Sequence, residues 1–177
     1  AYGLFVNKDI FDACELSLPS TPEEFLECCR VLKEKGYDTP VGANRWWLET
    51  FVFAQAYADL YNGGDTAAEI EALNAGRARY SDYLRPGFEF LQTLIDAGYI
   101  DAENALVSEA FEGVGEGADF MAGDCPIVMA YWGAANTDTA YGSPDFNMEV
   151  IGFPTERGQM PVLSMTGYAV GEGSAAV

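Results

Sequence analysis

FMAGDCPIVMAYWGAAN, residues 120–136, is the stretch around which the rest of the chain is organised. Its centre, PIVMAY at 126–131, is a short and nearly unbroken apolar run, typical of a strand buried on both faces of a sheet that helices cover. Pro126 suits the first position of such a strand, where no backbone donor is needed. The run ends in Tyr131 and Trp132, and ligands of open α/β sheets gather at the carboxyl ends of strands. The spacing leaves open whether these rings face a ligand or cover the core.

The composition indicates a globular chain with an acidic surface. Its 177 residues are 49% apolar and 14% aromatic, enough for one domain with a proper core. No apolar run reaches the roughly 18 residues that a membrane-spanning helix needs. The net charge of −19 repels nucleic acid and anionic membranes, so those partners are not expected. The charge suits neutral or cationic small molecules, and equally suits solubility alone.

The sequence has no histidine, and this excludes several kinds of site. Ser-His-Asp triads, Cys-His nucleophiles and histidine-containing metal sites all require one. Four cysteines are present, Cys14, Cys28, Cys29 and Cys125, without the CxxC spacing of zinc or redox sites. We expect four small buried hydrophobes, and a bridge from Cys14 to Cys28 or Cys29 remains open.

Hydrophobic periodicity predicts strands that alternate with helices. The strongest signal is 20–36, where the hydroxyl of Thr21, then Pro22 and two acids, start a helix that Gly36 ends. Further helices are predicted from Lys8, over 45–61, over 81–97 with a start delayed by Pro86 and Gly87, and over 109–122, with 65–76 as a weakly helical connector. Strands are predicted at 3–7, 39–44, 127–131, 148–153 and 162–170. This order predicts an α/β fold packed in layers.

Two motifs that suggest cofactor or metal sites fail on their chemistry. GVGEG at 113–117 has no following lysine, and the acids around it would repel a phosphate. DLYNGGDTAAEIE at 59–71 has Tyr, Gly and Ile where a calcium loop needs oxygen ligands. We therefore expect no cofactor and no metal. A pair of carboxylates suited to a glycosidase arises by chance among 28 acids, so we expect a binding protein, not an enzyme.

The remaining candidates form an aromatic and amide-rich set near predicted strand ends. Flat aromatic faces stack on the apolar faces of sugar rings, while amides bond to the hydroxyls. Trp132, Asn44 and Asn136 have this chemistry. Trp46 and Trp47 directly follow a loop, and we expect one of them to pack inward and leave the other for a ligand.

The order of several segments resembles a known family. YGLFVNKDIFD at 2–12 and STPEEFLECCRVLKEKG at 20–36 are similar to the extracellular solute-binding proteins, family 1. The similarity continues through 91–99, 117–132, 153–154 and 165–174 (MTGYAVGEGS), and so covers nearly the whole chain. Proteins of this family serve ABC importers and most often bind sugars or oligosaccharides.

The resemblance implies a layered α/β lobe of a periplasmic-binding-protein-like, type II, fold. Such proteins have two lobes that close on the ligand by bending at a hinge. Residues 1–177 resemble a single domain, most of the second lobe, with the first lobe absent; the start at Ala1 and the ending GEGSAAV agree with this. The resemblance also implies a periplasmic protein or cell-surface lipoprotein whose signal lies outside this segment. The importer's membrane subunits would be its partner, with no membrane insertion by the segment itself.

The resemblance also points to particular binding residues. A tryptophan that stacks on the ligand stands near the place of Trp132, and Tyr131 or the turn at 133–136 could substitute for it. Thr166 and Gly167 lie in a segment similar to the glycine-rich crossing that lines the cleft. One of the two adjacent tryptophans resembles a further cleft aromatic.

Other readings of the sequence remain. The same transport role could serve an amino acid, a peptide or a polyamine, and a basic ligand would need a concentrated patch of carboxylates in the cleft. A glycosidase fragment would need two acids at a defined separation. An adhesion module would bind another protein through exposed aromatics and would lack a cleft.

Overall fold

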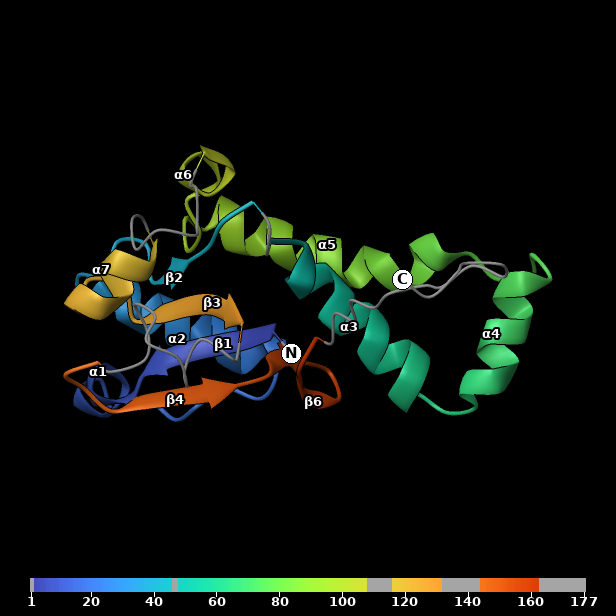
Figure 1. Ribbon diagram of the computed structural model, residues 1–177, viewed down its shortest axis with the longest axis horizontal. Coiled ribbons are helices and arrows are strands. Elements are labelled where there is room, and N and C mark those ends of the chain that lie inside the picture. The colour runs from blue at the N-terminus through green and yellow to red at the C-terminus, as the bar shows by residue number, and fades with distance from the viewer. Residues whose placement is uncertain (1, 46–47, 108–115, 132–143, 163–177) are drawn as a thin grey trace, which may run out of the picture.

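The computed structural model describes residues 2–45, 48–107, 116–131 and 144–162 (Figure 1). Its helices are α1 (Lys8–Ala13), α2 (Pro22–Glu34), α3 (Leu48–Asn62), α4 (Thr66–Asn74), α5 (Tyr80–Asp96), α6 (Ala102–Val107) and α7 (Glu116–Ala122). Its strands are β1 (Tyr2–Asn7), β2 (Val41–Gly42), β3 (Ile127–Tyr131), β4 (Met148–Ile151), β5 (Phe153–Thr155) and β6 (Gly158–Met160). Helices and strands thus share one fold, which confirms the predicted α/β class, although they do not alternate strictly: α3 to α7 follow one another, and so do β3 to β6.

The strands form a mixed sheet in which β3 and β1 are central. The order is β2-β3-β1-β4, with β2 parallel to β3 and β1 antiparallel to both β3 and β4. Phe5 of β1 is level with Val128 of β3 and Val150 of β4. In this arrangement β2, β3 and β4 all end at the same side of the sheet, where β1 begins.

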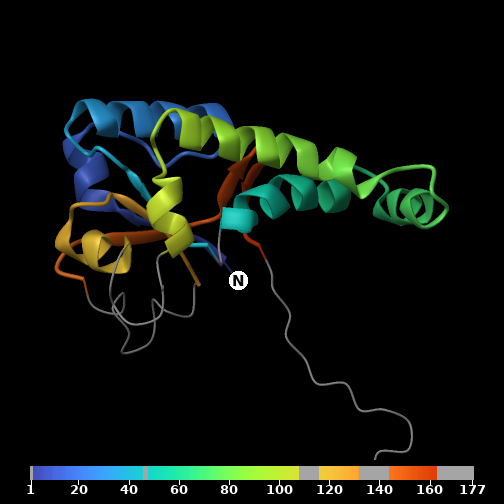
Figure 2. The ribbon, with the colours of Figure 1, turned by 90° about the horizontal axis from the view of Figure 1, so that it is seen from above.

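Alternate residues of the central strands enter two different apolar clusters. Leu4, Ile127 and Met129 point into the large core formed with α2, α3 and α5, whereas Phe5 and Val128 pack against Phe120 of α7. Figure 2 shows α2 and α5 along one side of the sheet and α7 on the other. Ile127, Val128 and Met129 have no exposed surface, so the prediction of a strand buried on both faces is confirmed.

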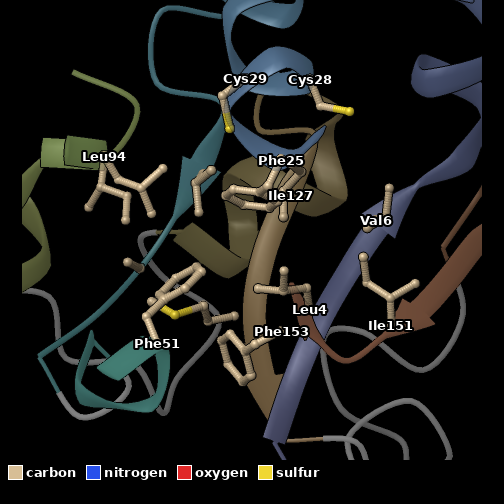
Figure 3. Packing of buried hydrophobic residues seen from close by; sticks show 14 of the residues in the cluster. Leu4, Val6, Phe25, Cys28, Cys29, Phe51, Leu94, Ile127, Ile151 and Phe153 are labelled. Atoms are coloured by element: carbon tan, nitrogen blue, oxygen red, sulfur yellow. The ribbon is translucent and has the colours of Figure 1, made fainter. Parts of the chain in front are cut away.

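Four phenylalanine rings tie the helices to the strands in the large core. The ring of Phe51 on α3 lies 5.9 Å from Phe25 on α2, 6.0 Å from Phe90 on α5 and 4.9 Å from Phe153 on β5. The contacts are tilted or edge-to-face, the arrangements that aromatic pairs prefer. Figure 3 shows Phe25, Phe51 and Phe153 converging with Leu4 and Ile127 between the helices and the sheet.

Helix α2 begins as its sequence predicts. The backbone N–H of Glu24 donates to Oγ1 of Thr21, and the Glu24 carboxylate accepts in return from the Thr21 N–H, which makes a complete capping box. Pro22 occupies the first turn, where its missing N–H costs nothing. Gly36 has φ +105°, a conformation that suits glycine after a helix end.

The delayed start predicted for the helix over 81–97 is wrong, because α5 continues through Pro86. Proline has no N–H for the carbonyl of residue 82, but the packing of this turn against α3 outweighs the loss. Gly87 allows that packing: a Cβ at this position would lie 2.5 Å from Cα and 2.6 Å from the carbonyl oxygen of Val52 on α3. The glycine therefore lets the two backbones approach closely.

Several other elements differ from the predictions. Residues 65–76 contain a capped helix, α4, because Oδ1 of Asp65 accepts from the N–H of Ala68. The single strand expected over 148–153 is divided at Gly152. A Cβ added at this glycine would lie 2.8 Å from the Met160 backbone nitrogen, so the two backbones approach closely here. After this point β5 leaves the main sheet and pairs with β6. Helix α6 and strand β6 had no clear sequence signal. The strands expected beyond Val162 and the helix residues 109–115 lie outside the described residues.

All four cysteines lie in the described part of the chain and none forms a disulfide, so neither bridge from Cys14 is present. Cys28, Cys29 and Cys125 are buried as predicted, but Cys14 is only half-buried. Burial, followed by the nearby carboxylates of Glu24 and Glu27, raises the pKa of the Cys28 thiol to about 11. The Sγ of Cys125 lies 3.1 Å from the carbonyl oxygen of Ile127 and holds the entry to β3.

The close approach of α3 and α5 can be tested by replacing Gly87 with alanine. Within a helix, glycine to alanine ordinarily stabilises by about 0.5–1 kcal/mol. Here the new Cβ meets backbone atoms of α3, so we expect Gly87→Ala to lower the free energy of unfolding by about 1–3 kcal/mol. Urea denaturation measures the change. Ser81→Ala, at an exposed position of α5, is the control and should stay within about 0.5 kcal/mol, and a stabilised Gly87→Ala variant would contradict the close packing.

Candidate ligand-binding site

The candidate site lies where three strands end together. We call this side of the sheet the carboxyl edge: it is marked by the ends of β2, β3 and β4 at Gly42, Tyr131 and Ile151 and by the start of β1 at Tyr2. Tyr2 is paired with Tyr131, which places both residues at this edge. The mixed sheet thus gathers ends from segments far apart in the sequence, the usual setting for a ligand in an α/β fold.

Asn44 and the beginning of α3 also lie at the carboxyl edge. Gly42 of β2 is paired with Val128 of β3, and Asn44 follows Gly42 by two residues. Asn44 is completely buried, and its carbonyl oxygen accepts from the N–H of Leu48 at 3.2 Å. The chain therefore passes from β2 into α3 within a few residues of the strand ends. Of the predicted residues, Tyr131 ends β3 and Asn44 follows the end of the neighbouring β2 by two residues.

The segment after β6 returns to the same edge. Tyr2 and Val162 exchange two backbone hydrogen bonds, from the N–H of Tyr2 to the Val162 oxygen at 2.7 Å and from the N–H of Val162 to the Tyr2 oxygen at 3.1 Å. This antiparallel bridge joins the start of β1 to the chain that leads toward Thr166 and Gly167 in the sequence. The start of β1 and the segment after β6 are thereby fixed to each other at the carboxyl edge.

Helix α3 is held over the edge by polar contacts as well as by its rings. The buried side chain of Gln55 donates from Nε2 to the carbonyl oxygen of Pro154 at 2.7 Å. Near the helix start, Oγ1 of Thr50 lies 3.8 Å from Sδ of Met129 on β3. These contacts attach α3 to β5 and β3, so the residues at its amino end keep a fixed position relative to the strand ends.

Most of the predicted binding residues lie outside the described part of the chain. They are Trp46, Trp47, Trp132, Asn136, Thr166 and Gly167. In the sequence they directly adjoin or closely follow Arg45, Leu48, Tyr131 and Val162, which the structure places at the carboxyl edge or at the start of α3. Their role in binding stays a prediction.

Helix α3 also carries a row of rings that were not among the predicted binding residues. Phe53, Tyr57 and Tyr61 follow one another at intervals of four residues, and we call them the aromatic row. The rings of Phe53 and Tyr57 lie 5.9 Å apart, and those of Tyr57 and Tyr61 lie 5.6 Å apart. Such spacing is typical both of a helix face buried in a core and of a helix face that binds a ligand. Only the exposure of the rings distinguishes these two cases.

A hollow of about 400 Å3 runs along β2, from Gly36 before the strand to Ala43 after it. Its lining includes four aspartates, Asp38, Asp101, Asp119 and Asp124. Within the described ranges, no group of three or more Cys, Asp or Glu side chains is arranged to hold a metal ion. These aspartates line the hollow on the side of the amino ends of β2 and β3, whereas Gly42 and Ala43 line it toward the carboxyl edge. No helix of the described residues has the length and apolarity to cross a membrane.

The fold is a layered α/β fold in which the ends of β2, β3 and β4 gather at the carboxyl edge. The chain matches the family of bacterial extracellular solute-binding proteins over residues 1–176 and belongs to that family. A comparison with functionally curated proteins gives no match.

Solved structures with the same fold include three from sugar-utilising systems. One comes from work on xylan utilisation by Caldanaerobius polysaccharolyticus, with 24% identity, a TM-score of 0.66 and coverage of 90% of this chain and 40% of that one. A sugar transporter from Bacillus licheniformis in complex with stachyose has 19% identity, a TM-score of 0.65 and coverage of 90% and 41%. A sugar transporter from Arthrobacter chlorophenolicus A6 with bound laminaribiose has 17% identity, a TM-score of 0.61 and coverage of 90% and 38%. This chain spans about two fifths of the length of each.

The anchor between α3 and β5 is open to a direct test. Gln55→Ala leaves the buried carbonyl of Pro154 without its donor, so we expect the free energy of unfolding to fall by about 1–3 kcal/mol. Gln92→Ala is the matched control, because Gln92 is exposed and its side chain donates to Asp96 one turn along the same helix, α5. Thermal and urea denaturation measure both variants. Equal, small effects of the two substitutions would show that the buried hydrogen bond does not hold α3.

Proposed function

We propose that this chain is most of the second lobe of a two-lobed solute-binding protein that delivers a sugar or oligosaccharide to an ABC importer. The observation that supports this most is the carboxyl edge, where β2, β3 and β4 end beside the start of α3. Two structures of the same fold hold stachyose and laminaribiose. The rings that stack on a sugar would come from Trp132 and from Trp46 and Trp47, which are consecutive in the sequence.

In this proposal the protein binds without chemistry. A first lobe would face the carboxyl edge, and the sugar would lie between the two lobes. The paired backbone at Tyr2 and Val162 would form part of the hinge, because both chain passages meet there. Membrane subunits of the importer would then recognise the closed form. The protein would work outside the cytoplasmic membrane, either in the periplasm or as a cell-surface lipoprotein.

The distribution of carboxylates favours an uncharged ligand over a polyamine, a basic amino acid or a basic peptide. A cationic ligand would need acids at the carboxyl edge. The four aspartates that gather in one hollow, among them Asp38 and Asp124, lie toward the amino ends of β2 and β3 instead. A sugar requires rings and amides, and in the sequence Trp46, Trp47 and Trp132 with Asn136 have that chemistry.

A thermal-shift screen of the full-length protein tests the proposed ligand class. A ligand that binds only the folded state raises the melting temperature by mass action. We expect a rise with one class of saccharide and none with amino acids, peptides or polyamines. Trp132→Ala should abolish or strongly reduce the rise, whereas Phe88→Ala, which removes an exposed ring on α5, should leave it unchanged.

Each outcome of the screen separates two ideas. A rise retained in Trp132→Ala would keep the function and move the stacking role to Trp46 or Trp47. A rise in melting temperature with amino acids, peptides or polyamines alone would contradict the proposal that the ligand is a sugar. The proposed role in an ABC importer would remain. The isolated 177-residue chain should bind the same saccharide weakly or undetectably, because the other half of the cleft is missing; full affinity in calorimetry would contradict the two-lobed site.

A further inference from the structure

The aromatic row lies on the side of α3 that faces the sheet at the helix start. Thr50 contacts Met129 of β3, and Tyr57 follows Thr50 by seven residues, which is two helical turns. Phe53 and Tyr61 are one turn before and one turn after Tyr57. The side of α3 that meets β3 therefore continues as the aromatic row.

The row extends beyond the sheet in the direction in which β3 runs out. Tyr61 lies about 16 Å from Thr50 along the helix axis, since an α-helix rises 1.5 Å per residue. Figure 1 shows α3 and α5 projecting together past the end of β3. The row thus starts beside the carboxyl edge and leads away from it, over a length much greater than that of one sugar ring.

The rings of the row are accessible and carry free polar groups. Phe53 and Tyr57 are half-buried, whereas Tyr61 is 52% exposed and the neighbouring Tyr80 is 40% exposed. Burial, followed by Tyr57 and Tyr61, raises the pKa of Tyr80. Among the described residues, no hydrogen bond links the hydroxyls of these three tyrosines to another residue. Ring faces and hydroxyls are the groups with which proteins hold sugars.

We propose that the aromatic row is a second, outer binding surface, on which the distal rings of an oligosaccharide lie while its first rings occupy the carboxyl edge. This inference rests on the proposed sugar-binding function and adds that the ligand is a chain of several sugars. The row is continuous with the carboxyl edge through Thr50 and β3. The net charge of −19 favours such an uncharged ligand over an acidic partner.

The test compares short and long saccharides on the full-length protein. Isothermal titration calorimetry is run with three pairs of probes: xylobiose and xylohexaose, chitobiose and chitohexaose, and laminaribiose and laminarihexaose. For the pair that binds, we expect Tyr61→Ala to lower the affinity for the hexasaccharide about tenfold. The affinity for the disaccharide should stay within about twofold of that of the unaltered protein. Tyr57→Phe keeps the ring and removes only the hydroxyl, so it should have a smaller effect of the same kind. Phe88→Ala, an equally exposed ring elsewhere, should change neither affinity.

The outcomes distinguish the outer surface from the proposed function. A hexasaccharide that binds no tighter than the disaccharide, or a Tyr61→Ala variant that binds both as the unaltered protein does, would overturn the outer surface and leave sugar binding intact. Equal losses for both lengths would also overturn it, because they would report a general structural effect. If none of the probes binds to the unaltered protein, these sugar classes and the outer surface fail together.

Discussion

The structure depends on the double burial of β3. Ile127, Val128 and Met129 have no exposed surface, so this strand must be hydrogen-bonded on both sides and covered on both faces. β1 and β2 provide the hydrogen bonds, while α7 covers one face and the phenylalanine cluster around Phe51 covers the other. β2 is parallel to β3, and β1 is antiparallel to it. The pairing that satisfies the backbone hydrogen bonds of β3 therefore also brings the end of β2, the end of β3 and the start of β1 together at the carboxyl edge.

The position of α3 follows from the same constraint. Phe51 fixes the helix over the sheet, Gln55 attaches it to β5, and the close approach at Gly87 joins it to α5. Since α3 and α5 are longer than the strands beneath them, the pair projects past the end of β3 (Figure 1). The part that projects cannot bury both of its faces. The far end of the aromatic row lies on that part, which explains why Tyr61 is exposed although its spacing is that of a core face.

The strongest local signals in the sequence predicted the elements that organise the fold. The capping residues Thr21 and Glu24 start α2, and the apolar run gives β3 at 127–131, because caps and buried strands are encoded within a few residues. The predictions for Pro86 and for 148–153 were wrong because contacts distant in sequence decide both: α5 packs on α3, and Gly152 lies against Met160. For the site, the sequence pointed to the strand ends, and Asn44 and Tyr131 do lie there. Exposure, which marks the aromatic row, cannot be read from spacing.

The most direct test of this account is amide hydrogen exchange of the full-length protein with and without a saturating oligosaccharide. Bound ligand slows the exchange of the backbone that it covers or orders. We expect slower exchange at 42–45 and 48–50, at the end of β3 and around Val162, which lie at the carboxyl edge or next to it. Protection confined to 36–39 and 119–125, around the aspartate hollow, would contradict it, because the ligand would then bind at the opposite end of the strands.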